Sequence, residues 1–114
     1  MDYDAYMPHI NVKDGVARVL NNKKLYFNLL IKFKGRTMAN NVISAINAGD
    51  SNEVVQTAHA LKGTAANLGF PTVYKITEEI ESNAKKGNPC PDLVPQLEAA
   101  IDDLEHAVAK LTTE

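Results

Sequence analysis

Apolar residues recur every three or four positions along most of this chain, which is the period of an amphipathic α-helix. The most regular stripe runs through residues 51 to 68 and occupies a sector of the helix about 80° wide. Similar stripes cover residues 72 to 86 and residues 92 to 111. No segment shows the sustained alternation that is typical of strands, so the pattern predicts an all-α fold. The first stripe consists of Val54, Ala58, Leu61, Ala65 and Leu68.

Capping residues fix the ends of the helix over residues 51 to 68. Asp50 is a favourable N-cap, and Glu53 completes a capping box. Gly69 suits the left-handed turn that ends a helix, and Pro71 suits the first turn of the helix that follows. Because only about three residues join these two helices, we expect them to pack antiparallel as a hairpin.

The N-terminal part of the chain is less regular. Residues 1 to 10 show no clear period, and we interpret them as a lead-in that docks onto the helices. Asn11 is the predicted cap of a short helix, which Asn21 and Asn22 interrupt. The apolar face of this short helix comprises Val12, Val16, Val19 and Leu20.

A longer helix is predicted from residue 25 to residue 48. The side of its apolar face changes near Gly35, which indicates either a kink or a straight helix that changes its packing neighbour. We favour the straight helix, because no other stop signal occurs there. The two halves of the face carry Leu25, Tyr26, Leu29, Leu30 and Phe33, and then Met38, Val42, Ala45 and Ile46.

These elements predict one domain over residues 11 to 114, because a chain of 114 residues has room for a single core. Its predicted architecture is an up-and-down four-helix bundle with an additional short N-terminal helix. Asp92 or a close neighbour is expected to cap the last helix. Pro95 falls in the first turn of that helix, where a missing amide hydrogen does little harm.

Composition and charge exclude several classes of function. The 12 basic and 14 acidic residues give a net charge of −2 without a basic run, so nucleic acid and anionic membrane are poor candidate partners. The one cysteine, Cys90, supports neither an internal disulfide nor a cysteine-based metal site. No apolar run reaches the roughly 18 residues of a membrane span, and the acidic N-terminus is unlike a signal peptide. We therefore expect a cytoplasmic, monomeric protein without a metal site.

His59 lies on the helix over residues 51 to 68, about 140° from the centre of the apolar stripe. Lys62, one turn further on, brings an ammonium group close to the ring, and Gly63 leaves the ring without a covering side chain. A glycine inside an exposed helix costs about 1 kcal/mol relative to alanine, so we interpret Gly63 as giving access to a visiting group. An uncovered imidazole beside a cation suits a group that becomes negatively charged. A phosphoryl group on a ring nitrogen is the natural candidate.

The hairpin geometry identifies a partner for His59. Residues equidistant from the midpoint of the turn lie at the same height, which places His59 beside Glu81 and Lys62 beside Glu78. We predict that Glu81 accepts a hydrogen bond from Nδ1 of His59, which leaves Nε2 outward and nucleophilic. A midpoint shifted by about three or four residues would put Glu78 in that place. Lys85, on the same flank, would be a second cation.

The motif His59-Ala60-Leu61-Lys62-Gly63, followed by Leu68-Gly69, resembles the signature of the histidine-containing phosphotransfer (HPt) domain of two-component phosphorelays. Gly15 to Arg18 and Leu25 to Phe33 are similar to the opening helices of that family, so the resemblance covers nearly the whole chain. It implies that His59 accepts a phosphoryl group from an aspartate of a receiver domain and passes it to another receiver. Members of the family commonly carry a glutamine or glutamate on the next helix, and Glu81 matches that position.

The resemblance also implies the partners, which are receiver domains of response regulators or a hybrid histidine kinase. The receiver would bind Mg²⁺, and this chain would be a phosphocarrier without a cofactor or catalytic activity of its own. We expect docking on the face around His59, through Asn52, Val55, Gln56 and Ala66. A start at Met1 with a short lead-in favours a free-standing protein over a domain of a larger kinase.

Two other functions remain open on the same residues. One is a helical docking module that binds a receiver or a kinase without carrying phosphate. The other is a phosphatase that discharges a receiver through His59. His9 and His106 have no supporting neighbours, and we interpret both as structural or surface residues. No glycine-rich phosphate loop or nucleophile elbow is present to indicate an independent enzyme.

Overall fold

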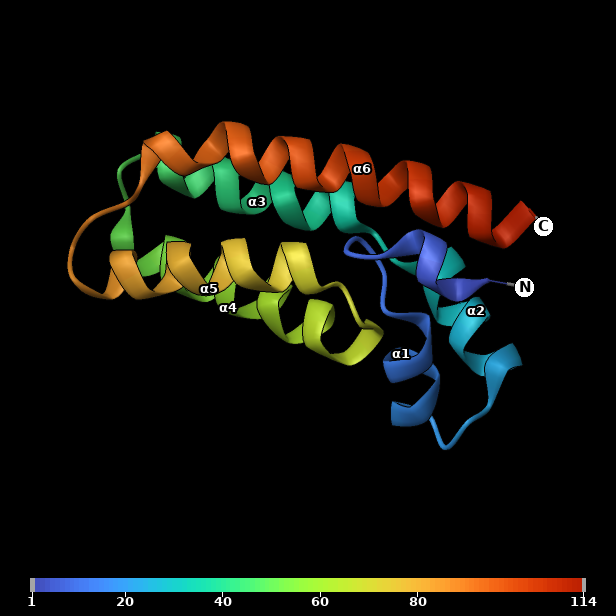
Figure 1. The fold of residues 1–114 in the computed structure, drawn as a ribbon. Helices are drawn as coiled ribbons and strands as arrows, with labels where there is room; N and C mark the ends of the chain where they lie inside the picture. Colours follow the sequence, from blue (N-terminus) through green and yellow to red (C-terminus); the bar gives the residue numbers. More distant parts are fainter. Residues whose placement is uncertain (1, 114) are drawn as a thin grey trace.

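Six α-helices and two 3₁₀ turns make up the computed structural model, which describes residues 2–113 (Figure 1). No strand occurs within these residues, so the prediction of an all-α fold is confirmed. The 3₁₀ turns are η1 (Tyr3–Tyr6) and η2 (Pro91–Leu93). The helices are α1 (Val12–Arg18), α2 (Lys23–Lys32), α3 (Gly35–Asn47), α4 (Ser51–Leu68), α5 (Pro71–Lys85) and α6 (Val94–Thr113).

The helices α3 to α6 pack around a shared hydrophobic core. Each of them packs against the next along the chain, and α6 also packs against α3. Figure 1 shows α3 beside α6 in one layer and α4 beside α5 in the other, with α1 and α2 at one end. The most extensive contact joins α4 to α5, the hairpin that carries the predicted site residues.

Helix α4 forms over the residues that the sequence predicts. At its start, the side chain of Asp50 accepts a hydrogen bond of 3.2 Å from the backbone N–H of Glu53, as an N-cap does. At its end, Gly69 adopts the left-handed conformation with φ 78°. The five apolar residues of the predicted stripe are all buried, which turns the opposite face of α4 away from the core.

The C-terminal end of α4 is tied to the N-terminal part of the chain. The hydroxyl of Tyr26 donates to the carbonyl oxygen of Leu68 at 2.6 Å, and the backbone N–H of Asn11 donates to the carbonyl oxygen of Gly69 at 2.6 Å. These bonds satisfy carbonyl groups near a helix end, where intrahelical partners run out. Only glycine fits at position 69, because its φ is positive and a Cβ would lie 2.5 Å from the carbonyl oxygen of Asn11.

The prediction of a straight helix through Gly35 is wrong, because the chain breaks between α2 and α3. Phe33 is extended, with φ −66° and ψ 125°, and α3 starts at Gly35. The break allows the ring of Phe33 to pack on the ring of Phe70, with centroids 5.0 Å apart. A Cβ at position 35 would lie 2.5 Å from the Phe33 ring, so glycine makes room for it. The bundle is therefore preceded by two short helices instead of one.

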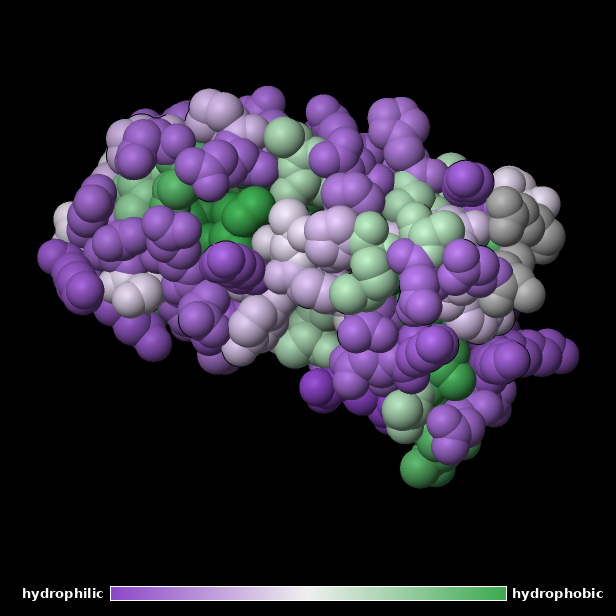
Figure 2. All heavy atoms as spheres, viewed as in Figure 1, coloured by the Kyte–Doolittle hydropathy of each residue, from purple (hydrophilic) through white to green (hydrophobic). Residues whose placement is uncertain are grey.

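Part of the apolar face predicted for these short helices is exposed. Leu20, in the connection between α1 and α2, is 93% exposed, and Leu25 and Leu29 are 44% and 37% exposed. Figure 2 shows hydrophobic atoms on the surface at this end of the molecule. Tyr26 and Leu30 make the buried contacts of α2. A helix that meets its neighbours along one narrow line buries only the residues on that line.

The segment before α1 also packs on the bundle. In the lead-in, Tyr6 and Ile10 are buried among core residues. Asp92 lies inside η2 and does not cap α6, which begins at Val94 and carries Pro95 in its first turn.

Within residues 2–113, no helix combines the length and the apolar character needed to cross a membrane.

Candidate functional site

His59 lies on the face of α4 opposite the buried stripe, and its side chain is 67% exposed. The neighbouring position one turn further on is Gly63. A Cβ built at Gly63 would meet no atom within 4 Å, so the space beside the ring is open. The imidazole is therefore accessible to an incoming molecule, because no side chain at position 63 covers it.

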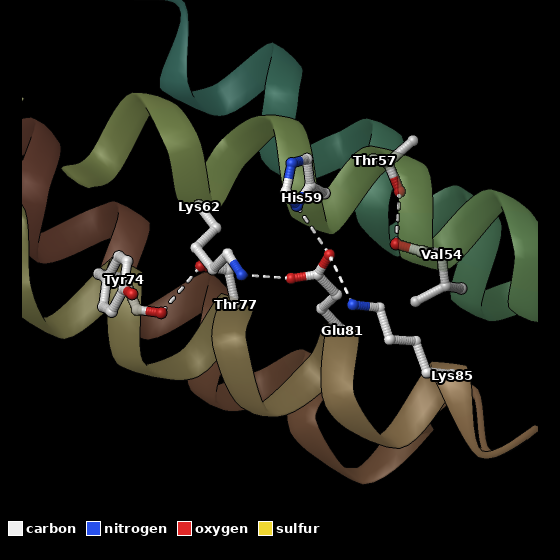
Figure 3. A network of polar contacts seen from close by, with 8 residues as sticks. All are labelled: Val54, Thr57, His59, Lys62, Tyr74, Thr77, Glu81 and Lys85. Atoms are coloured by element: carbon white, nitrogen blue, oxygen red, sulfur yellow. Dashed lines mark hydrogen bonds and ion pairs between the residues drawn. The ribbon is translucent and has the colours of Figure 1, made fainter. Parts of the chain in front are cut away.

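Glu81 of α5 holds one side of the His59 ring. Nδ1 of His59 lies 2.8 Å from Oε2 of Glu81, whose side chain is only 4% exposed. An ionised carboxylate can only accept hydrogen bonds, so Nδ1 is the donor. In the neutral ring the lone pair then resides on Nε2, which points away from Glu81 (Figure 3).

Two lysines share the same carboxylate (Figure 3). Nζ of Lys62 lies 2.5 Å from Oε1 of Glu81, and Nζ of Lys85 lies 3.7 Å from Oε2. The sequence placed Lys62 beside Glu78, but its side chain reaches along α5 to Glu81 instead. Counting residues from the turn predicts which backbone positions of the two helices lie at the same height. It does not predict the contacts of a lysine, because its four-carbon side chain can reach a residue one helical turn further along.

The charges of this network stabilise one another. Burial is the largest influence on Glu81 and raises its pKa, but the hydrogen bonds from Lys62 and His59 and the charges of Lys62 and Lys85 outweigh it. The pKa of Glu81 is therefore lowered overall, and the carboxyl is ionised at neutral pH. The hydrogen bond to Glu81 in turn raises the pKa of the Lys62 ammonium.

The predicted docking residues surround His59 on the outer face of α4. Asn52 and Gln56 are exposed, and Val55 and Ala66 are half-buried. Gln56 lies on the flank towards α3, where it lines a shallow hollow. These four side chains are uncharged and mostly short, and the desolvated core of an interface is similarly poor in charge. The charged network of Glu81, Lys62 and Lys85 adjoins His59 on the side of α5.

The sequence did not reveal that α1 borders this face. Asn11, Asp14 and Arg18 of the α1 region line a hollow of about 230 Å³ together with Ala66 and Tyr74. Asp14 and Arg18 form an ion pair of 3.1 Å. Periodicity indicates which face of a helix is apolar, but it does not indicate which part of the bundle receives that face.

Other chemically active side chains lie apart from this network. Within residues 2–113, no group of three or more His, Cys, Asp or Glu side chains is placed to hold a metal ion. Cys90 is buried, and burial raises the pKa of its thiol. His9 and His106 line a separate hollow between the lead-in and α6.

The helical bundle and the exposed, acid-bound imidazole together have the form of a phosphoryl-carrying module. The family model of the Hpt domain matches residues 34–107, and the chain belongs to this family. The fold is also similar to the crystal structure of the HPT domain from a sensor hybrid histidine kinase of Shewanella, with a TM-score of 0.77 and 20% sequence identity. That alignment covers 91% of this chain and 93% of the other. No curated protein matches the chain.

The resemblance drawn from the His59 motif is thus confirmed at the level of the family. Hpt domains are phosphocarrier modules of two-component signalling, and they interact with receiver domains and histidine kinases. The match begins at residue 34, so η1, α1 and α2 precede the part of the chain that the family model covers.

Proposed function

We propose that this protein carries a phosphoryl group on Nε2 of His59, taken from a receiver-domain aspartate and passed to the aspartate of another receiver. The observation that supports this proposal is the hydrogen bond from Nδ1 to Glu81, because it leaves the exposed nitrogen with a free lone pair. The proposed reaction is reversible and needs no nucleotide site in this chain.

In the forward step, the lone pair of Nε2 attacks phosphorus while the bond between phosphorus and the aspartyl oxygen breaks. The aspartate leaves as a carboxylate with the bonding electrons. Nδ1 keeps its proton, so the ring acquires a positive charge, and the buried carboxylate of Glu81 stabilises that charge. The return step follows the same path in the opposite direction, and no proton has to leave the ring.

The neighbours of His59 each have a proposed role. Lys62, one turn along the same helix, attracts the phosphoryl oxygens, and Lys85 adds a second positive charge to the site. Gly63 keeps the approach to Nε2 open. The protein needs no cofactor of its own, because the receiver supplies both the aspartate and the Mg²⁺ that phosphoryl transfer requires.

Receivers would dock on the face that surrounds His59. Asn52, Val55, Gln56 and Ala66 lie around the ring, and the hollow between α1 and Ala66 extends this surface. A carrier must release one partner before it meets the next, and an interface of modest area suits that requirement. Such exchange fits a protein that acts as a monomer.

Incubation with a phosphorylated receiver tests the proposal. We expect label to appear on the wild-type protein and none on His59→Gln, whose helical circular dichroism should be unchanged. The matched control is His106→Gln, since His106 is an exposed histidine on α6, and it should be labelled like wild type. Label retained by His59→Gln would overturn the assignment.

The same experiment separates the other two functions. Free phosphate that appears faster than protein-bound label would indicate a receiver phosphatase. Receiver binding without any transfer, and unaffected by His59→Gln, would indicate a docking module that carries no phosphate.

A further inference from the structure

Lys62 and Lys85 both contact Glu81, but they hold different positions relative to His59. We propose that Lys85 is the permanent counter-ion of Glu81, which allows Lys62 to leave Glu81 and bind the phosphoryl group when His59 is phosphorylated. This inference rests on the proposed function of His59 and assigns separate tasks to the two cations.

The helices decide which lysine reaches the phosphoryl group. Lys62 follows His59 by three positions on α4, so the two side chains are neighbours on one helix face. Lys85 follows Glu81 by four positions on α5. Figure 3 shows the two lysines approaching Glu81 from opposite sides. Rotation of its own side chain along α4 carries the ammonium of Lys62 from Oε1 of Glu81 towards Nε2. Lys85 extends from the other helix and lies beside Oε2, the oxygen that binds Nδ1 of His59.

In the unphosphorylated protein the ammonium of Lys62 is committed to Glu81, since its Nζ lies 2.5 Å from Oε1. A phosphoryl group on Nε2 offers three oxygen atoms that share about two negative charges at neutral pH, against one on the carboxylate. The stronger acceptor is also on the more exposed side of the ring. Phosphorylation therefore favours transfer of the Lys62 ammonium from Glu81 to the phosphoryl oxygens.

Departure of Lys62 would leave a buried charge poorly compensated unless another cation took its place. The side chain of Glu81 is 4% exposed, and a buried carboxylate without a partner is costly. Lys85 is 62% exposed and lies 3.7 Å from Oε2, which is an ion-pair distance longer than a hydrogen bond. Its flexible chain can close the remaining gap, so Glu81 stays ionised and keeps its bond to Nδ1.

The net charge of the site predicts that loss of Lys85 has a measurable effect on the phosphorylated state. With a neutral ring, the two lysines and Glu81 carry a net charge of plus one. On transfer, the phosphoryl oxygens bring about two negative charges and the ring becomes positive, so His59 gains one net negative charge. The phosphorylated site is therefore neutral overall. Without Lys85 the phosphorylated site would carry a net negative charge, so loss of this lysine disfavours the phosphorylated state.

Phosphorylation by phosphoramidate tests the exchange without any receiver. Nε2 attacks the phosphorus of this small donor, the P–N bond breaks, and ammonia leaves. We expect Lys85→Met to lower the lifetime of the phosphohistidine, followed by ³¹P NMR, by about two- to fivefold, the size expected for one exposed charge. Lys85→Arg should restore the lifetime, because the charge returns.

Lys86→Met is the matched control, since it removes the same charge from the next, exposed position, and it should behave like wild type. A second readout follows the side-chain ammonium groups by ¹⁵N NMR. On loading, the Lys62 signal should shift and couple to phosphorus, while Lys85 shows no coupling to phosphorus.

Equal lifetimes for Lys85→Met and Lys86→Met would overturn the proposal, as would coupling of phosphorus to Lys85 in place of Lys62. Failure of receivers to label the wild-type protein would instead refute the proposed function. The phosphoramidate measurements would still report on the exchange in that case, so the two failures are distinguishable.

Discussion

Nδ1 of His59 lies 2.8 Å from Oε2 of Glu81, although 22 positions separate the two residues in the sequence. The contact joins α4 to α5 across the hairpin and determines which ring nitrogen is free. The same carboxylate also contacts Lys62 and Lys85. One buried acid therefore organises the three basic side chains of the site.

Replacement of Glu81 by leucine removes the acceptor of Nδ1. We expect the ring proton to redistribute between Nδ1 and Nε2, and single-turnover transfer from a receiver to slow by about 10- to 100-fold, as for the loss of a partner that orients a reacting group. The ¹⁵N chemical shifts of the ring report the tautomer directly.

Glu81→Gln is the control for that experiment, because a side-chain amide oxygen can still accept from Nδ1. It should keep the Nδ1–H tautomer and lose less of the transfer rate than Glu81→Leu, because it retains the orienting bond and removes only the charge that stabilises the phosphorylated ring. Equal losses in the leucine and glutamine variants would show that orientation of the ring is not the role of Glu81.

The lowered pKa of Glu81 predicts a pH-dependent contribution to stability. A glutamate in an unfolded chain titrates at about pH 4.3. Because the folded pKa is lower, the ion pairs stabilise the protein fully above that pH, and the contribution is lost as the pH falls through the folded pKa. Urea unfolding should show Glu81→Gln to be about 1 kcal/mol less stable than wild type at pH 7, with the difference disappearing in strong acid.

Glu98, an exposed acid on α6, provides the comparison for the acid experiment. Glu98→Gln should change the free energy of unfolding by less than about 0.5 kcal/mol at pH 7. A loss in Glu81→Gln that stays constant down to low pH would contradict an ionic origin.

Two substitutions of Gly63 distinguish its effect on the stability of the protein from its effect on access to His59. A Cβ at this position meets nothing within 4 Å, so Gly63→Ala should raise the free energy of unfolding by about 1 kcal/mol through helix propensity alone. Gly63→Met should retain most of that gain, but its longer side chain covers the approach to His59 and should slow transfer from a receiver. Thermal unfolding and transfer rates measure the two effects, and unimpaired transfer in Gly63→Met would refute the access role.

Gly69 and Gly49 both have positive φ but differ in their surroundings. A Cβ at Gly49 would meet no atom within 4 Å, whereas one at Gly69 would lie 2.5 Å from the carbonyl oxygen of Asn11. Gly49→Ala should therefore cost only the backbone strain of about 1 kcal/mol. Gly69→Ala should cost about 3 kcal/mol, because the contact between Asn11 and the end of α4 must also open. Equal losses in chemical denaturation would contradict this account.

The sequence alone predicted the hairpin that carries the site. The bounds of α4 follow from Asp50 and Gly69, which are local signals, and its buried stripe follows from periodicity. The short α4–α5 connection fixes the helices as antiparallel, so counting from the turn was enough to pair His59 with Glu81. Those inferences need no information from distant parts of the chain.

Features that depend on distant contacts were not predictable in the same way. The break before α3 is stabilised by packing of Phe33 on Phe70, residues that lie far apart in the sequence. The partner of Lys62 depends on the reach of a flexible side chain, so Glu78 was expected where Glu81 is found. The exposure of Leu20 reflects how little of α1 and α2 meets the bundle, which a periodic pattern does not report.

Helix α4 is held at its start by Asp50 and at its end by Tyr26 and Asn11, and it presents its histidine on one outer face. Under the proposed function, a donor and an acceptor must therefore occupy the same surface in turn, and no complex of all three proteins can form. Steady-state transfer should follow ping-pong kinetics, and an excess of unphosphorylated donor should inhibit it by competition.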